Sequence, residues 1–181
     1  MAQVIAETSR PRRLRGRTRQ SVLLVHVVSA GAWLGIDVVM AVLVFTALLS
    51  GDDTTLALTY RALEMFAVWS LFTAGVVCLV SGVVLGLGSK YGLVRYWWVA
   101  VKLVLNVLLA TLVLVALRPG VSEAAERARL FESGEVTTLS VGDLIFPPVV
   151  STTALLVAFV LAVYKPWGRI GQGRRGGTAQ L

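Results

Sequence analysis

The feature that most constrains this chain is the run from Ser21 to Leu49, where only His26 and Asp37 carry strongly polar side chains. A helix of about 20 apolar residues crosses a hydrocarbon core of ~30 Å. Four stretches meet this requirement, at residues 22–49, 65–88, 97–117 and 144–164, and none alternates as a barrel strand does. The sequence therefore predicts an all-α integral membrane four-helix bundle.

The spans define a single domain, residues 21–164, between two tails. Residues 1–20 form a basic N-terminal tail, and residues 165–181 form a basic, glycine-rich tail that we expect to be flexible.

Two connections are expected on the same side of the membrane. Residues 55–64 read as a short connection, and residues 118–143 read as a loop because Arg118-Pro119-Gly120 would end the third span. Within that loop, residues 122–132 resemble a short charged helix with Ser122 as its N-cap and Gly134 beyond its end.

The cations are distributed unevenly along a chain of net charge +7. The termini and the connection between spans two and three hold Arg10, Arg12, Arg13, Arg15, Arg17, Arg19, Lys90, Arg95, Lys165, Arg169, Arg174 and Arg175. The other two connections hold Arg61, Arg118, Arg127 and Arg129 among Asp52, Asp53, Glu64, Glu123, Glu126, Glu132, Glu135 and Asp143. Because loops rich in Lys and Arg remain on the cytoplasmic side of a membrane, we expect a cell-membrane protein with both termini cytoplasmic.

The basic N-terminal tail has a lipid interpretation. Arginines beside a span attract anionic lipid headgroups, at about 1 kcal/mol per residue. No aromatic residues are interleaved with them, so we expect no nucleic acid partner.

The sequence contains no motif of a hydrolytic or phosphate-binding enzyme, and an enzyme is the less favoured interpretation. The single cysteine, Cys78, excludes an internal disulfide and a multi-cysteine metal site, so no metal is expected and Cys78 reads as a packing residue.

The polar residues inside the spans are the candidate functional residues, because ionisable groups in a membrane are costly. His26 lies seven residues after Arg19, and Lys102 lies seven residues after Arg95. Both spans cross the membrane in the same direction, so we expect the two side chains at similar depths in the membrane. Asn106 lies one turn beyond Lys102 on the same face. Asp37 lies on nearly the same face of the first span as His26, about 16 Å further along the helix axis.

Each of these residues also has a structural interpretation. Lys102 could extend to the headgroups, and His26 could be a hydrogen-bonded packing residue. Asp37 could pair with Arg118 or accept hydrogen bonds from Ser and Thr hydroxyls. The tryptophans, Trp33 among them, read mostly as interfacial anchors.

Two pairs of glycines have the spacing of helix-packing motifs. Gly31 and Gly35 lie in the first span, and Gly82 and Gly86 lie in the second. Such pairs let two helices approach closely. We expect packing within the bundle, with homo-oligomerisation as the alternative.

Two motifs resemble those of an actinobacterial family of uncharacterised four-helix membrane proteins. One is His26-Val-Val-Ser-Ala-Gly-Ala-Trp33-Leu-Gly35, and the other is Gly92-Leu-Val-Arg95-Tyr96-Trp97-Trp98-Val-Ala-Val-Lys102-Leu. The resemblance covers residues 20–118 and implies a membrane bundle without an established activity.

The same residues are distantly similar to HemJ-type protoporphyrinogen oxidases and to CopD-type copper-resistance membrane proteins. That likeness implies a haem or porphyrin cofactor bound by His26 and Lys102. The chain departs from it by having a single histidine, with Tyr96 where the family often has another, so two histidines cannot ligate one haem within a subunit.

Three hypotheses follow from these observations. The first is a non-catalytic structural or partner-binding membrane bundle, with a homo-oligomer or a membrane partner. The second is a haem- or porphyrin-binding redox protein that uses His26 and Lys102. The third is a small ion-coupled carrier or channel that uses Asp37.

Overall fold

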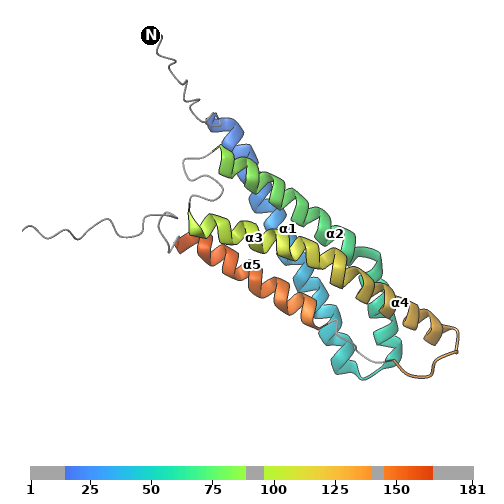
Figure 1. The fold of residues 1–181 in the computed structure, drawn as a ribbon. Helices are drawn as coiled ribbons and strands as arrows, with labels where there is room; N and C mark the ends of the chain where they lie inside the picture. Colours follow the sequence, from blue (N-terminus) through green and yellow to red (C-terminus); the bar gives the residue numbers. More distant parts are fainter. Residues whose placement is uncertain (1–14, 89–95, 140–144, 165–181) are drawn as a thin grey trace, which may run out of the picture.

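The computed structural model describes residues 15–88, 96–139 and 145–164 and consists of long helices packed side by side (Figure 1). In chain order these are α1 Gly16–Ser50, α2 Asp53–Leu87, α3 Trp97–Leu112, the π-helix η1 Val113–Leu117, α4 Arg118–Glu132 and α5 Phe146–Tyr164. The three segments α3, η1 and α4 form one continuous helical path.

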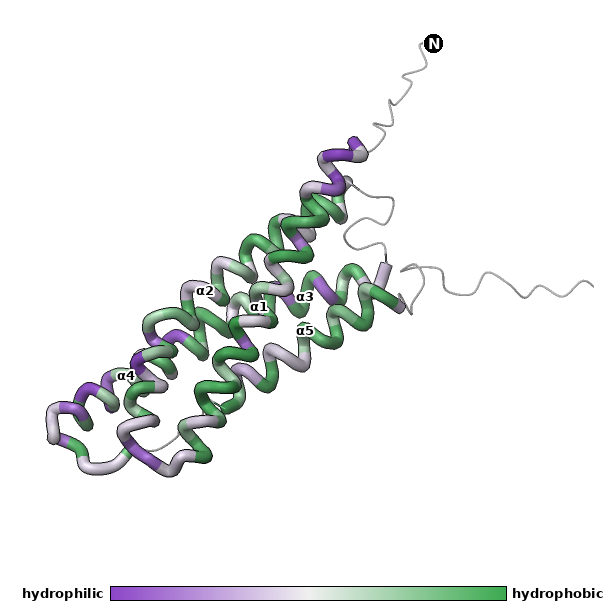
Figure 2. The backbone as a smooth tube through the Cα atoms, turned by 180° about the vertical axis from the view of Figure 1, so that it is seen from behind, coloured by the Kyte–Doolittle hydropathy of each residue, from purple (hydrophilic) through white to green (hydrophobic). Residues whose placement is uncertain are grey.

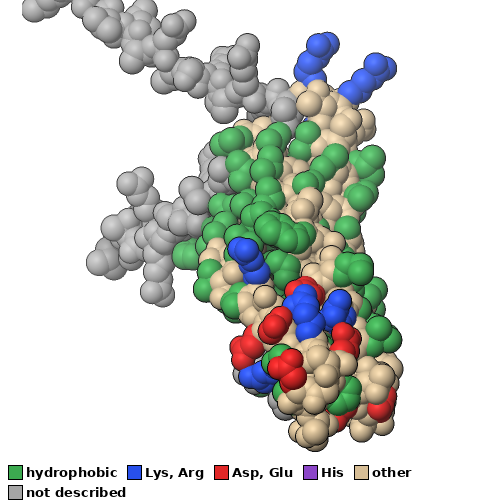
Figure 3. Space-filling view, turned by 90° about the vertical axis from the view of Figure 1, so that its right-hand side faces the viewer, with side chains coloured by type: hydrophobic (Ala, Val, Ile, Leu, Met, Phe, Trp, Pro, Cys, Tyr) green, Lys and Arg blue, Asp and Glu red, His purple; other side chains and the backbone are tan. Residues whose placement is uncertain are grey.

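The surface of this bundle is suited to lipid. Four helical segments are long and apolar enough to cross a membrane. Large apolar side chains such as Leu24, Val115 and Val163 are more than half exposed on the outside of the helices. Figure 2 shows the hydrophobic middle of the bundle, and Figure 3 shows acidic and basic side chains gathered at one end. The prediction of an all-α, four-helix membrane protein is confirmed.

The helices form a ring in which α1 and α3 face each other diagonally. α1 packs against α2 and α5, and α3 packs against the same two helices (Figure 1). We call the end at which α1 begins, with Arg15, Arg17 and Arg19, the basic end. We call the opposite end, where Gly51 and Asp52 join α1 to α2, the hairpin end.

At the hairpin end, α1 and α2 are longer than the spans predicted from the sequence. The predicted connection at residues 55–64 is wrong, because α2 begins at Asp53. The Asp52 carboxylate accepts hydrogen bonds from the backbone amides of Thr54 and Thr55 at 3.3 and 2.9 Å, which caps the helix. At 1.5 Å per residue, α1 and α2 are each about 52 Å long and exceed the thickness of a hydrocarbon core.

The predicted break at Arg118-Pro119-Gly120 is also wrong, because the helix continues to Glu132 and Ser122 lies inside it. A proline in a helix removes a hydrogen bond to the preceding turn. Here the turn before Pro119 is the wider π-helix η1. The end of α4 agrees with prediction: Gly134 has φ +80°, and the amides of Gly134 and Glu135 bond to the carbonyls of Phe131 and Leu130.

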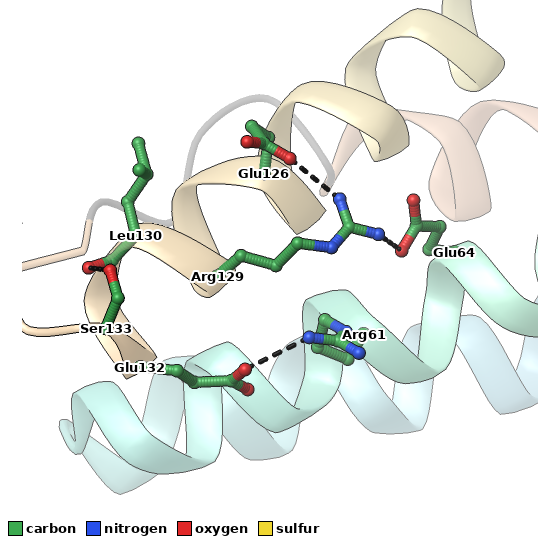
Figure 4. A network of polar contacts seen from close by, with 7 residues as sticks. All are labelled: Arg61, Glu64, Glu126, Arg129, Leu130, Glu132 and Ser133. Atoms are coloured by element: carbon green, nitrogen blue, oxygen red, sulfur yellow. Dashed lines mark hydrogen bonds and ion pairs between the residues drawn. The ribbon is translucent and has the colours of Figure 1, made fainter.

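Packing against α2 explains why α4 stays helical. Val121, Ala124, Ala125 and Ala128 are buried on the face toward α2. Two ion pairs cross between the helices, Arg61–Glu132 at 3.0 Å and Arg129–Glu64 at 2.6 Å (Figure 4).

The π-helix marks a change of packing partner along the third helical path. α3, before η1, packs against both α2 and α5, whereas α4, after it, packs against α2. After η1, the third helical path therefore moves away from the start of α5.

Candidate functional site

A chain of hydrogen bonds links the buried residues Trp33 and Asp37 of α1 to the half-buried Ser151 of α5. The Trp33 indole Nε1 donates to the Ser151 hydroxyl at 3.1 Å, and that hydroxyl donates to Asp37 Oδ2 at 2.6 Å. Trp33 and Asp37 are 0% and 1% exposed. The other carboxylate oxygen, Asp37 Oδ1, is buried and has no hydrogen-bond partner among the described residues.

Trp33 is therefore a core residue, and its assignment as an interfacial anchor is wrong. Its six-membered ring lies against Gly75 of α2, where an added Cβ would approach Trp33 Cζ3 to 2.4 Å. Only glycine leaves room for the indole there. By contrast, Trp69 and Trp97 are more than half exposed, as residues at a membrane surface are.

The predicted pairing of Asp37 with Arg118 is wrong as well. The Arg118 guanidinium lies over the ring of Trp69, 5.8 Å from its centroid, and its side chain is exposed. The second interpretation of Asp37, acceptance of a hydroxyl hydrogen bond, agrees with the Ser151 contact.

Asp37 and Ser151 line a cavity of about 680 Å³ that lies toward the hairpin end of the bundle. All the helices contribute to it: its walls are mostly apolar, with Met40, Leu71, Leu109, Leu112, Val113, Phe146 and Val150 among them. The polar residues Tyr60, Glu123 and Arg127 also line it, from α2 and α4. Its volume falls in the range of about 300–1,000 Å³ that is usual for small-molecule sites.

The cavity lies where the third helical path leaves α5. Val113, Ala116 and Leu117 of η1 form part of its wall, and Pro147 at the start of α5 forms another part. π-Helical turns are frequent at functional sites. The arrangement is a concave, mainly apolar chamber with one buried carboxylate at its wall, which suits binding better than bond-making chemistry.

His26 belongs to a second polar group, nearer the basic end. Its Nδ1 lies 2.9 Å from the Cys78 carbonyl oxygen and 3.1 Å from the Ser81 hydroxyl of α2. The Ser81 hydroxyl itself donates to the Val77 carbonyl at 2.6 Å. Both neighbours of Nδ1 therefore act as acceptors, which assigns the proton to Nδ1 and the lone pair to Nε2.

Lys102 and Asn106 approach this group from α3. The Lys102 ammonium lies 4.7 Å from the centre of the Trp98 ring and close enough to act electrostatically on His26 and Cys78. Asn106 Oδ1 is buried with no hydrogen-bond partner among the described residues. His26 and Asp37 thus belong to separate groups along α1, and the 680 Å³ cavity borders Asp37.

The two glycine pairs occupy different surfaces. Gly82 faces the His26 ring, whose Cε1 would lie 3.1 Å from an added Cβ, and Gly86 is buried. Gly31 and Gly35 are exposed, and nothing in the described residues lies within 4 Å of a Cβ added at either. The first-span pair therefore does not pack inside the bundle as expected, because the face of α1 that carries it points outward.

Sequence reasoning missed Ser151, Gly75 and Tyr60. Ser151 had a usable signal, since it is a hydroxyl in an apolar span, but Thr152 and Thr153 beside it have the same signal. Gly75 and Tyr60 have no distinguishing pattern. No group of three or more His, Cys, Asp or Glu side chains that could hold a metal ion occurs in the described parts of the chain.

The long apolar helices and the polar groups between them define an integral membrane four-helix protein. The chain belongs to the DUF2269 family of predicted integral membrane proteins, whose family model matches residues 20–166. No curated protein and no solved structure matches the chain significantly. The matched region includes both polar groups and all four candidate spans, apart from the first residues of α1.

Proposed function

We propose that this protein is a non-catalytic membrane bundle that binds a small, largely apolar ligand in the cavity at its hairpin end. The observation that carries the proposal is the position of Asp37, a buried carboxylate with one unpartnered oxygen at the wall of a 680 Å³ cavity. A large apolar pocket with a few convergent polar groups is the usual form of a ligand site.

The charge distribution supports an orientation for this binding site. The two tails and the connection between the second and third spans hold twelve Lys and Arg residues, whereas Arg61, Arg118, Arg127 and Arg129 lie toward the hairpin end. By the positive-inside rule, both termini are cytoplasmic, and the cavity then lies toward the outer face of the cell membrane. The exposed arginines of α1 then lie beside the anionic headgroups of the inner leaflet.

Thermal unfolding in lipid nanodiscs tests the proposed function with 2-phenylethanol as a neutral probe. A ligand that binds only the folded state raises the melting temperature in proportion to its occupancy. Val150 lines the cavity and Val149 does not, although both are about half exposed on α5. Val150→Phe should therefore remove the shift, and Val149→Phe should keep it.

Two results would contradict the proposal. One is a wild-type protein without any shift at concentrations that saturate the nanodisc lipid. The other is an equal shift in both valine variants, which would place the probe in the lipid and not in the cavity.

A second candidate function, haem or porphyrin binding, is favoured by the His26 geometry. A metal-binding histidine usually donates its other ring N–H to a carbonyl or carboxylate. His26 Nδ1 is placed to donate to the Cys78 carbonyl, which leaves Nε2 to hold an iron, with Lys102 nearby for a propionate. An absorption band near 400–420 nm that His26→Ala removes would support this candidate, and a spectrum without such a band would reject it.

A further inference from the structure

We infer that the cavity selects ligands that carry an ammonium group, which Asp37 Oδ1 holds while the apolar walls bury the rest of the molecule. The inference rests on the proposed function and adds the chemical class of the ligand.

The direction of the hydrogen bonds determines which carboxylate oxygen is open. An indole N–H can only donate, so Trp33 Nε1 uses a lone pair of the Ser151 hydroxyl. The hydroxyl proton is then directed to Asp37 Oδ2, 2.6 Å away. Oδ1 keeps its acceptor capacity with no donor among the described residues. For the ionised carboxylate, a ligand at this wall must therefore supply a donor.

No cation of the described residues forms an ion pair with Asp37. Arg127, which lines the same cavity, pairs with Glu123 at 2.6 Å, and Arg129 pairs with Glu64 and Glu126. A buried carboxylate without a cation is costly in a medium of low polarity. A ligand cation offsets more of that cost than a neutral donor does.

The rest of the cavity favours an organic cation over a metal ion. A metal ion at Asp37 would find the Ser151 hydroxyl beside it among apolar walls, and the other carboxylate of the cavity, Glu123, is paired with Arg127. Hard cations require six or more oxygen ligands. The same apolar walls suit the hydrocarbon body of an amine, and the ring of Tyr60 in the wall can attract its charge.

The test compares three probes of similar size on the protein in nanodiscs: 2-phenylethylammonium, 2-phenylethanol and phenylacetate. We expect the ammonium to bind the wild type roughly tenfold or more tightly than the alcohol, and the carboxylate not to bind. Asp37→Asn should reduce the affinity for the ammonium to that for the alcohol. Asp53→Asn, at the start of α2 and outside the cavity lining, should leave all affinities unchanged.

The outcomes separate this inference from the proposed function. Equal binding of ammonium and alcohol, with both lost in Val150→Phe, overturns the ammonium inference and leaves the cavity as a ligand site. Binding of none of the three probes overturns both. The order of the three probes on the wild type decides the inference even if Asp37→Asn does not fold.

Discussion

The Ser151 hydroxyl lies 2.6 Å from Asp37 Oδ2 and joins α5 to α1 inside the apolar bundle. It is also the acceptor for the Trp33 indole, so one hydroxyl satisfies two buried groups of α1. The Asp37 carboxylate is consequently held in one orientation, with Oδ2 toward α5 and Oδ1 without a partner. The position of the proposed ligand site depends on this contact.

Removal of the Ser151 hydroxyl should destabilise the bundle. Ser151→Ala leaves both Trp33 Nε1 and Asp37 Oδ2 without a partner, and we expect a loss of about 1–2 kcal/mol in the free energy of unfolding. Thr153→Ala is the control, because its exposed hydroxyl bonds only to the Val149 carbonyl of its own helix. Reversible unfolding in mixed micelles measures the difference, and equal losses in both variants would contradict the role of Ser151.

Gly75 should be intolerant of even a methyl group. Gly75→Ala places a Cβ 2.4 Å from Trp33 Cζ3, and the overpacking should cost about 1–3 kcal/mol of stability. Gly35→Ala adds the same methyl where nothing lies within 4 Å, so it should be neutral or slightly stabilising.

A double variant checks the cause of the Gly75 effect. Trp33→Phe removes the atoms that the new Cβ would meet, so its combination with Gly75→Ala should cost less than the sum of the single changes. If the losses of stability were additive, Gly75→Ala would act on α2 itself and not through contact with the Trp33 indole.

The start of α2 should depend on pH through Asp52. The hydrogen bonds from Thr55 and Thr54 lower the pKa of the Asp52 carboxyl below its ordinary value of 3.8. A lowered folded-state pKa means that this stabilisation is complete above the ordinary pKa and is lost as the pH falls through the lowered value.

Amide exchange measures that dependence at the start of α2. Protection of the Thr54 and Thr55 amides, corrected for intrinsic exchange rates, should decline below pH ~4 in the wild type. Asp52→Asn should cap the helix comparably at every pH, because asparagine accepts the same bonds without titrating. A decline of the same size in both proteins would exclude Asp52 as its cause.

The docking of α4 on α2 should weaken when Arg129 is replaced. Arg129 bonds to Glu64 of α2 at 2.6 Å and to Glu126 of its own helix at 2.8 Å (Figure 4). Arg129→Gln should increase hydrogen exchange of the last turns of α4, and high salt should produce part of the same effect in the wild type. Arg127→Gln, which breaks a pair within α4 only, should change exchange less.

The sequence predicted the four spans because apolar length alone decides them. It failed at the hairpin end, where helix continuation depends on contacts between distant residues, such as Glu64 with Arg129 and Arg61 with Glu132. A proline and a glycine in succession indicated a break, and the local signal did not include the alanine face that packs on α2.

For the candidate site, the sequence identified the polar residues but not their partners. Asp37 was identified as a carboxylate in a span, whereas its bond to Ser151 depends on the rotation of α5. Three successive hydroxyl residues, at 151–153, could each have faced α1. The cavity itself results from the divergence of α4 and α5 after η1, which no local pattern in either helix predicts.

Cysteine accessibility tests most directly whether a water-accessible cavity reaches the depth of Asp37. Met40 and Val44 are both buried core residues of α1, but only Met40 lines the cavity. In a Cys78→Ser background, Met40→Cys therefore places a smaller thiol at the cavity wall, and Val44→Cys places one outside the lining, one turn nearer the hairpin end. A charged, membrane-impermeant thiosulfonate is then applied to each side of sealed vesicles. We predict labelling of Met40→Cys from the outer face alone, its loss with Val150→Phe, and no labelling of Val44→Cys. Unlabelled Met40→Cys, or equal labelling of both positions, would contradict the cavity as a ligand site.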